Sequence, residues 1–439
     1  MSKSTASLDQ ALERIYARTA AGIRPGLDAI RAILEVLEHP EQRFLVIHIA
    51  GTNGKGSVAC LIESILRVLG VKTGLFTSPH LVRFHERFRV NGEAISDAAL
   101  EPLVRGIDAA DIEMLKRGGP RPCTFFELST AMAFEHFARS EVQIAVIETG
   151  MGGVWDSTNV VDPLVSVITR IGMDHMDYLG DSLLRIAGEK CGIIKPGRPV
   201  LSTRQETDKV DAIIEEAAQG ARVPYLRFTD DVGITPKSMN LDGQKFLLET
   251  PNADYGTCSL NLLGRHQLEN AALAVAASEM IVDQLGIDLP AQAVKKGLAS
   301  ARWAGRCSVV NRDPPIIIDG AHNHSGAEAL ADTLDHLFPG KKGAFVLGFL
   351  DGKQGEAMLA AWKPLVDQAW GVVVQSPRSL KLEAMQSLLQ GANISHVLGD
   401  LSQALEEART YAKGQDTFVC VAGSLYLAGE GLRLTGSSI

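Results

Sequence analysis

The sequence predicts an α/β protein with two domains: a P-loop-type, doubly wound, mostly parallel sheet, followed by a smaller Rossmann-like α/β domain. Its 439 residues exceed what a single hydrophobic core usually holds. Short apolar runs alternate with amphipathic helical patterns along most of the chain, which is typical of βα units. A glycine-rich loop joins one such run to a helix near residue 51. We place the domains at residues 1–300 and 301–439.

The N-terminal region is expected to be helical. Residues 8–38 carry two apolar stripes at helical spacing. They are interrupted by a turn made of Arg24, Pro25, Gly26 and Leu27. A simple link between two helices explains this turn.

Residues 44–57 read as a buried strand followed by a glycine-rich loop, and residues 58–69 have the apolar spacing of a helix. Such a loop directs backbone N–H groups towards one point at a helix N-terminus, where an anion binds. The predicted phosphate contacts are Gly54, Lys55, Gly56 and Ser57. The loop is shorter than the usual phosphate-binding pattern, because Ile49 stands where its first glycine is expected. A glycine-rich turn with a solvated lysine is the alternative.

A run of alternating charged and apolar residues follows a predicted strand that begins at Val71 and breaks at Pro79. Arg83, Arg87 and Arg89 fall in this run. One interpretation is a half-exposed strand or loop. The other is a basic patch with interleaved aromatic residues, which would suit a flat anionic substrate.

Residues 124–139 are predicted to form an amphipathic helix. Thr124 is a plausible N-cap, and Glu127 three residues later completes a capping box. Glu127 therefore has a structural explanation. Phe125 and Phe126 are more typical of a core than of a ligand platform.

Two further strands end in side chains that can bind a metal ion. Glu148 closes the strand predicted at 143–148, and His175 follows the strand that begins at Val165. Ligands of doubly wound sheets bind beyond the carboxyl ends of the strands, so both side chains are expected beside the phosphate loop. Mg²⁺ prefers oxygen ligands, and His175 alone is more typical of a surface histidine.

A second β/α alternation begins after residues 302–306, and we place the domain boundary there. The segments before it are predicted helices at 206–219, 264–280 and 290–299 and a β-rich stretch at 222–262. In the second domain we predict strands at 316–319, 344–348, 371–374 and 417–422 and helices at 355–369, 380–390 and 401–412.

Composition restricts the possible functions. Hydrophobic residues make up 46% of the chain and charged residues 22%, as in a soluble globular protein. The formal net charge of -9 argues against a nucleic-acid partner. The six cysteines show no CxxC spacing and are expected to be reduced thiols. We recognise no signal peptide or membrane span, and we expect a cytoplasmic monomer.

Several separate motifs, in order along nearly the whole chain, resemble one family. The chain is similar to the folylpolyglutamate synthase/dihydrofolate synthase group of the Mur-ligase superfamily. The matching segments are 50–57, 77–81, 124–127, 148–153, 174–175, 188–190, 264–267, 319–323 and 423–426. The compact phosphate loop agrees with this resemblance, because the superfamily uses that variant.

The resemblance implies a role for individual residues. The implied ATP contacts, besides the phosphate loop, are Asn270, Arg306 and Asp319. The implied Mg²⁺ ligands are Ser78 and Glu148, with His175 at a second metal position. The implied pteridine contacts are Arg24, Pro25, Gly26, Leu27, Thr124, Phe125, Phe126, Glu127, Trp155, Asp156 and Ser157. Lys190 matches the family's carbamylated lysine, whose carbamate oxygens suit Mg²⁺ better than an ammonium does. His322 would orient phosphate or glutamate, or simply cap a helix.

The implied reaction is an ATP-dependent amide ligation. The γ-phosphate goes to a carboxylate of dihydropteroate or a reduced folate, and the amine of L-glutamate then attacks the acyl phosphate. The sequence departs from the family at Val154, where an arginine is usual, and at Ala304, where a proline is usual. Trp155 could stack on the pterin or fill the core.

Three other functions are compatible with the same motifs. A Mur-type ligase acting on a UDP-linked muramyl substrate is one, although the phosphate loop lies too near the start for a preceding UDP-binding domain. The others are a P-loop ATPase that ligates nothing and a folate-binding protein without turnover.

Overall fold

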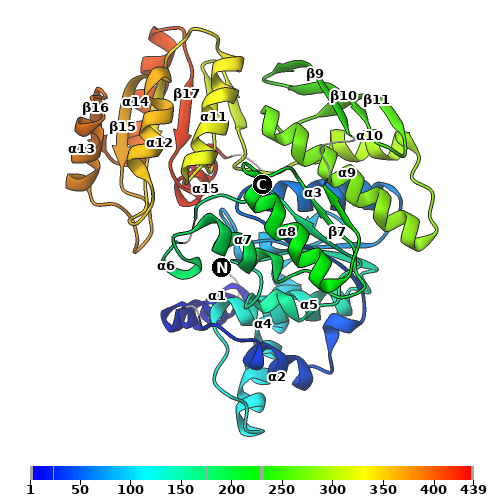
Figure 1. Cartoon of the computed structure of the whole chain (residues 1–439). Coiled ribbons are helices and arrows are strands. Elements are labelled where there is room, and N and C mark those ends of the chain that lie inside the picture. Colours follow the sequence, from blue (N-terminus) through cyan, green and yellow to red (C-terminus); the bar gives the residue numbers. More distant parts are fainter. Residues whose placement is uncertain (1–2, 23, 175, 228–231, 437–439) are drawn as a thin grey trace. The chain divides into compact units, whose positions relative to one another are not determined.

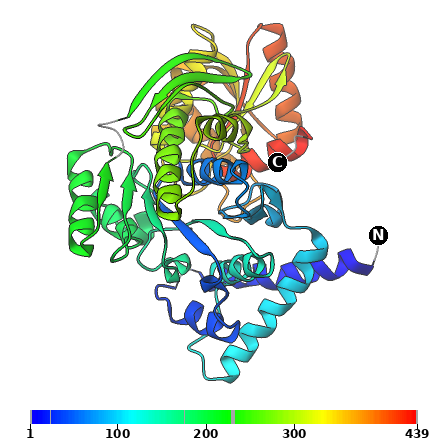
Figure 2. The same ribbon diagram turned by 90° about the vertical axis from the view of Figure 1, so that its right-hand side faces the viewer.

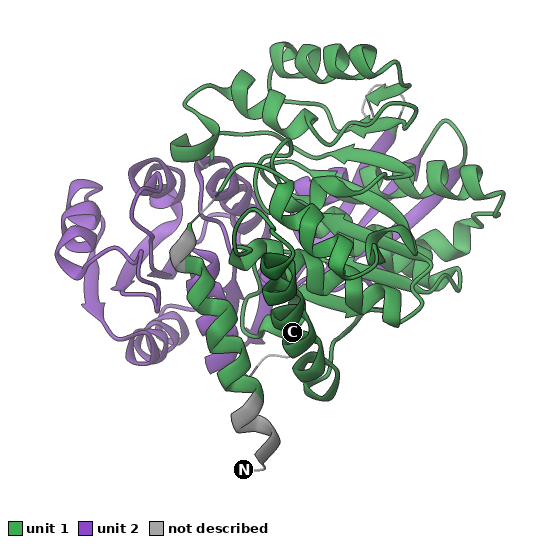
Figure 3. Cartoon of the chain, turned by 90° about the horizontal axis from the view of Figure 1, so that it is seen from below, with its two compact units in different colours: residues 1–232, 250–253, 270–297 green, residues 233–249, 254–269, 298–439 purple. Residues whose placement is uncertain are grey.

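The computed structural model describes residues 3–22, 24–174, 176–227 and 232–436 (Figure 1). The chain divides into two compact units, which Figure 3 colours separately. Unit 1 comprises residues 1–232, 250–253 and 270–297, and unit 2 comprises residues 233–249, 254–269 and 298–439. Each contains a mostly parallel sheet with helices, so the predicted fold class is confirmed. The domain boundary at residue 301 stays a prediction.

Unit 1 is built on an eight-stranded sheet with the order β4-β3-β2-β5-β1-β6-β7-β8. Its strands are β1 (Leu45–Ala50), β2 (Thr73–Phe76), β3 (Phe88–Val90), β4 (Glu93–Ala94), β5 (Ile144–Glu148), β6 (Val165–Ile168), β7 (Val200–Ser202) and β8 (Tyr225–Arg227). The six strands from β2 to β8 in this order are parallel, and β3 and β4 add an antiparallel edge. The three central strands β5, β1 and β6 are neighbours, so their carboxyl ends lie together at one edge.

Helices cover both faces of this sheet. They are α1 (Lys3–Ala17), α2 (Asp28–Val36), α3 (Lys55–Val68), α4 (Asp97–Lys116), α5 (Phe125–Arg139), α6 (Met176–Leu179), α7 (Leu183–Cys191) and α8 (Asp208–Ala221). Most of α9 (Arg265–Leu285) and α10 (Ala291–Ser300) also belongs to unit 1. Figure 2 shows the dark blue α1 crossing the cyan α4. Helices α1, α2, α4 and α5 bury one apolar core against the sheet, and α7 and α8 bury another.

Unit 2 contains two sheets. A three-stranded antiparallel sheet is formed by β9 (Gly233–Asn240), β10 (Gly243–Glu249) and β11 (Asp254–Leu260). A six-stranded sheet has the order β12-β13-β17-β14-β15-β16. Its strands are β12 (Ser308–Arg312), β13 (Pro315–Ile318), β14 (Gly343–Leu347), β15 (Val366–Val372), β16 (His396–Gly399) and β17 (Val419–Ala422). Its helices are α11 (His324–Leu337), α12 (Gly355–Trp362), α13 (Leu382–Gly391), α14 (Leu401–Gly414) and α15 (Leu425–Leu434).

The predicted helix at 355–369 is wrong in its second half. The structure ends α12 at Trp362, and β15 already begins at Val366. Leu359, Trp362, Val366 and Trp370 repeat every three or four residues, which imitates one face of a helix. All four side chains are buried, but Leu359 and Trp362 lie in a helix, whereas Val366 and Trp370 lie in a parallel strand. Strands β12 and β16 were not expected.

None of the helices in the described ranges combines the length and the apolar character needed to cross a bilayer.

Candidate active site

A glycine-rich loop connects β1 to α3. Gly54 precedes the helix with a left-handed φ of 89°, which suits a residue without a side chain. The first intrahelical hydrogen bond runs from Val58 N–H to the carbonyl of Gly54 (2.9 Å). The backbone N–H groups of residues 54–57 therefore lie in the open first turn, where a helix binds anions. The Ser57 hydroxyl is buried and, among the described residues, has no hydrogen-bond partner.

The loop is held against the end of β6. The N–H groups of Thr52 and Asn53 both donate to the carbonyl of Arg170, at 2.9 and 3.2 Å. Thr169 Oγ1 donates to the Asn53 carbonyl (2.8 Å) and lies so close to Gly51 that a Cβ there would be 1.8 Å from it. These contacts fix the path of the loop before any ligand arrives, which lowers the cost of ordering it.

Asn270, at the start of the unit 1 part of α9, lies directly beside the loop. A Cβ at Gly54 would be 2.7 Å from Asn270 Oδ1. The structure thus brings one of the predicted ATP contacts next to the predicted phosphate contacts.

Lys55 points across the loop towards the end of β5. Its Nζ donates to the carbonyls of Gly51 (3.2 Å) and Thr52 (3.3 Å) and lies 3.8 Å from Glu148 Oε1. Glu148 Oε2 accepts the Ser78 N–H at 3.1 Å. The solvated lysine of the alternative interpretation is wrong, because only 15% of this side chain is exposed. Its charge is held where an anion on the loop would need it.

Lys190, on α7, reaches the same loop from the other side. Its side chain is buried, and Nζ donates to the carbonyl of Gly51 at 2.7 Å. Burial, and secondly the nearby charge of Lys55, lower the pKa of Lys190 from 10.5 to about 7, although Asp174 and Asp156 oppose the shift. A substantial fraction of this amine is therefore neutral near neutral pH, and a neutral amine is a nucleophile.

The residues beside the loop fit a magnesium ion that is bound mainly through phosphate and water. Glu148 and the buried hydroxyl of Ser57 supply oxygen donors, as Mg²⁺ requires. In the described part of the chain, no three His, Cys, Asp or Glu side chains gather as a metal cage. Ser78 is partly buried, and only its backbone contact with Glu148 places it here. The predicted ligand His175 lies outside the described residues.

Comparison with known proteins identifies the family of this site. Residues 49–278 match the Mur ligase middle domain, and residues 305–425 match the Mur ligase, glutamate ligase domain. The dihydrofolate synthase/folylpolyglutamate synthase of Bacillus subtilis is 34% identical over 95% of this chain and 96% of its own.

The chain belongs to the dihydrofolate synthase/folylpolyglutamate synthase family.

Members of this family have been solved with ligands. The folylpolyglutamate synthase of Mycobacterium tuberculosis, complexed with ADP and AMPPCP, superposes with a TM-score of 0.90 at 33% identity and covers 99% of this chain and 100% of that one. A folylpolyglutamate synthase complexed with AMPPCP and folate superposes with a TM-score of 0.82 at 29% identity, covering 97% and 98% of the two chains. The chain is accordingly an enzyme, an ATP-dependent ligase of the Mur type.

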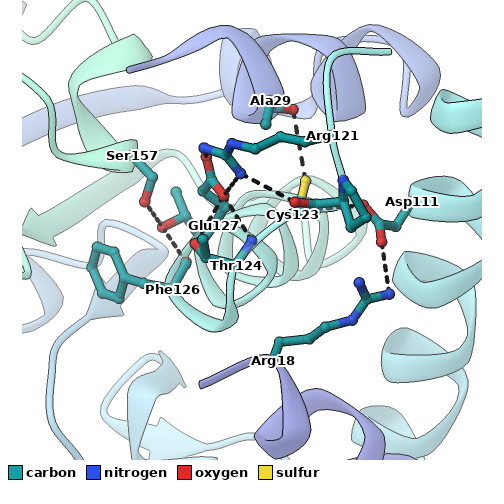
Figure 4. A network of polar contacts seen from close by, with 11 residues as sticks. Arg18, Ala29, Asp111, Arg121, Cys123, Thr124, Phe126, Glu127 and Ser157 are labelled. Carbon is teal, nitrogen blue, oxygen red and sulfur yellow. Dashed lines mark hydrogen bonds and ion pairs between the residues drawn. The ribbon is translucent and has the colours of Figure 1, made fainter. Parts of the chain in front are cut away.

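Residues 124–127, which were predicted to contact the pteridine, form the N-terminal cap of α5 (Figure 4). Thr124 caps α5, and its N–H and hydroxyl both donate to Glu127 Oε2, at 2.7 and 2.8 Å. Arg121 donates to both oxygens of Glu127, at 2.8 and 2.9 Å. The predicted capping box is confirmed, and Arg121, which was not predicted, holds the carboxylate from the side.

Glu127→Gln is expected to lower the free energy of unfolding by roughly 2 kcal/mol, because Arg121 loses its partner at a buried cap. Urea unfolding measures this change. Glu135→Gln is the matched control on the same helix, since its pair with Arg139 is exposed and should contribute less than about 0.5 kcal/mol. Equal losses in the two variants would show that the cap is not the stabilising element.

The two phenylalanines of this segment pack as core residues. Phe125 stacks on Tyr16 with ring centroids 5.5 Å apart, and Phe126 stacks on Phe76 at 5.9 Å. A Cβ at Gly150 would be 2.4 Å from the Phe126 ring. Both rings are only partly buried, so the contact with a pterin stays a prediction.

In the loop after Gly153, Trp155 differs from the two residues that follow it in its exposure to solvent. Asp156 and Ser157 are buried, whereas 55% of Trp155 is exposed. The core alternative for Trp155 is therefore wrong. Val154, at the position where the family usually has arginine, lies against Gly192, whose Cβ would be 2.4 Å from its side chain.

The predicted turn of residues 24–27 links two helices, as the simple interpretation expected. Arg24 and Pro25 are exposed, Gly26 is partly buried, and Leu27 points into the core beside α2.

The interpretation of Arg83, Arg87 and Arg89 as one basic patch is wrong, because each of these side chains has its own partner. Arg83 pairs with Asp97 at 2.8 Å, and Arg89 donates to backbone carbonyls. Only Arg87 faces the aromatic side chains, with its guanidinium 5.2 Å from the Phe125 ring centre and its Nε 2.8 Å from His80 Nδ1. The three arginines have different partners because Arg83 precedes the 3₁₀-helix Phe84–Arg87, Arg87 ends it, and Arg89 lies in β3.

In unit 2, the predicted residues Arg306 and Asp319 lie together at the end of β13. Asp319 accepts the N–H groups of Cys307 and Ala321, both at 2.7 Å. Burial raises the pKa of Asp319, and the charge of Arg306 opposes this rise. The following His322 bonds through Nδ1 to the Gly320 carbonyl (2.8 Å). The capping alternative for His322 is wrong, because Asn323 is the N-cap of α11.

The sequence analysis did not predict the side chains that hold the candidate site residues in place through hydrogen bonds. Thr52 and Thr169 hold the glycine loop in place, Arg121 holds Glu127, and His48 of β1 bonds to Thr158. The signal for Thr169 was available, since it directly follows β6 as Glu148 ends β5. His48 was visible as the one polar side chain in an apolar strand.

Proposed function

We propose that this ligase joins L-glutamate to dihydropteroate, and also to reduced folates, through an acyl phosphate. The observation that carries the proposal is the convergence of Lys55, Glu148 and Lys190 on the glycine loop of a chain that aligns with dihydrofolate synthase/folylpolyglutamate synthases along nearly its whole length. The folate complex of a relative supports the substrate class.

The geometry of unit 1 suits the first half of the reaction. The N–H groups of residues 54–57 and the amine of Lys55 would bind the phosphates of ATP, with Asn270 beside them. The substrate carboxylate attacks the γ-phosphorus, the bond to the bridging oxygen breaks, and ADP leaves. The positive groups offset the charge that develops on the transferred phosphoryl group. Arg306 and Asp319 of unit 2 are the further proposed ATP contacts.

In the second half, the amine of glutamate attacks the acyl carbon and inorganic phosphate leaves. Phosphate is a far better leaving group than hydroxide, so the amide forms without a strong base. His322 is proposed to orient the phosphate or the glutamate. The pterin would lie against Arg24 to Leu27, Thr124 to Glu127 and Trp155 to Ser157.

Magnesium would be held by Glu148 and Ser78, with His175 at a second position, and would supply charge neutralisation at the phosphates. We propose that Lys190 is carbamylated: its neutral amine adds to CO₂ and releases a proton. The carbamate would replace a repulsive ammonium by two oxygen donors beside the metal.

The cellular setting is also a proposal. All six cysteines are free and buried, which agrees with a reducing compartment such as the cytoplasm. We propose a monomer that acts on small molecules.

The deciding assay contains the protein, ATP, Mg²⁺, L-glutamate and dihydropteroate. Dihydrofolate and inorganic phosphate are expected in equal amounts, and replacing dihydropteroate by tetrahydrofolate tests the second activity. Phosphate release without glutamate would favour a simple ATPase. Binding of pterin without product would favour a folate-binding protein, and turnover of a UDP-linked muramyl substrate would favour another Mur-type ligase.

A further inference from the structure

His48 occupies an unusual place in the central strand of unit 1. It pairs in register with Ile147 of β5 and Ser166 of β6 and is fully buried. Its side chain shares a face with Val46, which packs into the core of α2 and α5. The residues that flank His48 along β1, Ile47 and Ile49, are apolar, so an aliphatic residue would satisfy the sheet at this position.

A chain of two hydrogen bonds starts at this histidine. His48 Nε2 lies 2.7 Å from Thr158 Oγ1, and Thr158 Oγ1 donates to Asp156 Oδ1 at 2.5 Å. The hydroxyl has a single hydrogen, which it donates to Asp156, so Nε2 donates to Thr158 when Asp156 is ionised. Burial raises the pKa of Asp156, and hydrogen bonds from Thr158 and Met151 oppose this rise. Burial lowers the pKa of His48 to about 3, which keeps the imidazole neutral in this tautomer.

The other ring nitrogen gains nothing from this arrangement. His48 Nδ1 is buried and, within the described residues, has no hydrogen-bond partner. An unsatisfied buried polar atom destabilises the folded state. The buried Nδ1 of His48 therefore destabilises the fold. The contact of Nε2 is the hydrogen bond to Thr158, which leads to Asp156.

The carboxylate at the end of the chain is held in a single orientation. Asp156 Oδ1 also accepts the Thr158 N–H (3.0 Å), and Oδ2 accepts the Met151 N–H (2.9 Å). The adjacent Ser157 is tied to Thr130 of α5 at 2.6 Å. The loop that would bind the pterin is thus oriented from β1 and from α5 together.

We propose that His48 is a positioning residue for the pterin substrate, acting through Thr158 on the carboxylate of Asp156. The inference rests on the proposed function, which places Asp156 at the pterin. A pterin presents adjacent N–H donors on one edge, and a carboxylate must hold a fixed plane to accept from them. Because β1 leads into the phosphate loop, the same strand then orients both substrates of the first half-reaction.

The test compares His48→Ala, Thr158→Val and His48→Gln in the full chain. Dihydropteroate binding is measured by calorimetry without ATP, and kcat and both KM values are measured by phosphate release. His48→Ala and Thr158→Val are expected to weaken dihydropteroate binding roughly ten-fold or more and to leave the KM for ATP within about two-fold. His48→Gln keeps an N–H donor near the position of Nε2 and should restore most of the affinity.

Ser166→Ala is the matched control. Ser166 is as buried as His48 and pairs with it in the sheet. Its hydroxyl donates to the Ile193 carbonyl, which is not part of the path from His48 to Asp156. It should lower the melting temperature and leave dihydropteroate binding unchanged.

Two outcomes would overturn the inference. One is a loss of stability in His48→Ala with wild-type dihydropteroate affinity in the variants. The other is an equal rise of the KM for ATP and for dihydropteroate. Thr158→Val is nearly isosteric, so it decides the case if His48→Ala does not fold. A wild-type protein that binds no dihydropteroate would instead remove the proposed function.

Discussion

Lys55→Ala is expected to reduce kcat/KM by roughly 10³-fold, because a preorganised charge at a phosphoryl group contributes several kcal/mol to the transition state. The Lys55 amine lies 3.2 Å from the Gly51 carbonyl and 3.8 Å from Glu148 in a largely enclosed position. A second lysine, Lys190, also donates to the Gly51 carbonyl, at 2.7 Å.

The measurement is steady-state phosphate release with saturating glutamate. Lys209→Ala, at an exposed position on α8, is the control for loss of a positive charge and should retain full activity. The melting temperature of Lys55→Ala should stay close to that of the unmodified protein, because the helix keeps its other contacts. Turnover within about three-fold of wild type would remove the phosphate role.

Lys190→Ala is expected to reduce kcat by roughly 10²–10³-fold, with partial recovery when acetate or another short carboxylate is added. The alanine leaves a cavity next to the Gly51 carbonyl, where an added carboxylate can supply the oxygens of the lost carbamate. Lys190→Met fills that space and should be equally inactive without being rescued. Rescue of both variants, or of neither, would contradict the carbamate.

The pH dependence of the wild-type protein provides a second readout. The pKa of Lys190 is about 7 in the folded protein and 10.5 normally. In CO₂-free buffer the unfolded state therefore binds more protons than the folded state between these values. The free energy of unfolding should rise with pH across this window. Below pH 7 the folded state must bury the charged ammonium, so the protein is least stabilised there. Lys190→Met should flatten the curve, and activation by bicarbonate should grow as the amine becomes neutral above pH 7.

Local sequence patterns predicted much of unit 1. The apolar run before the glycines became β1, the 124–139 pattern became α5, and its capping box formed as expected, because these features depend on neighbours within a few residues. The prediction failed at 366–369, where strand β15 takes residues with helical spacing, since pairing with β14 and β16 outweighs local preference.

In the candidate site, too, features set by local sequence were predicted and features set by tertiary contacts were not. Gly54 to Ser57 and Glu148 were predicted because each stands at a strand end, where doubly wound sheets bind ligands. The interpretation of Arg83, Arg87 and Arg89 as a basic patch failed because the sequence does not reveal which polar partner each arginine finds in the folded chain.

The sequence by itself determined the fold class, the family and the position of the glycine loop between β1 and α3, because ordered motifs and strand-to-helix transitions are local properties of the chain. The tertiary structure alone decided that Lys55 and Lys190 meet at the carbonyl of Gly51, and that His48 reaches Asp156 through Thr158. The Lys190–Gly51 and His48–Thr158 contacts join residues more than 100 positions apart. Their geometry and the shifted pKa of Lys190 arise from burial, which exists only once the sheet and its helices have packed together.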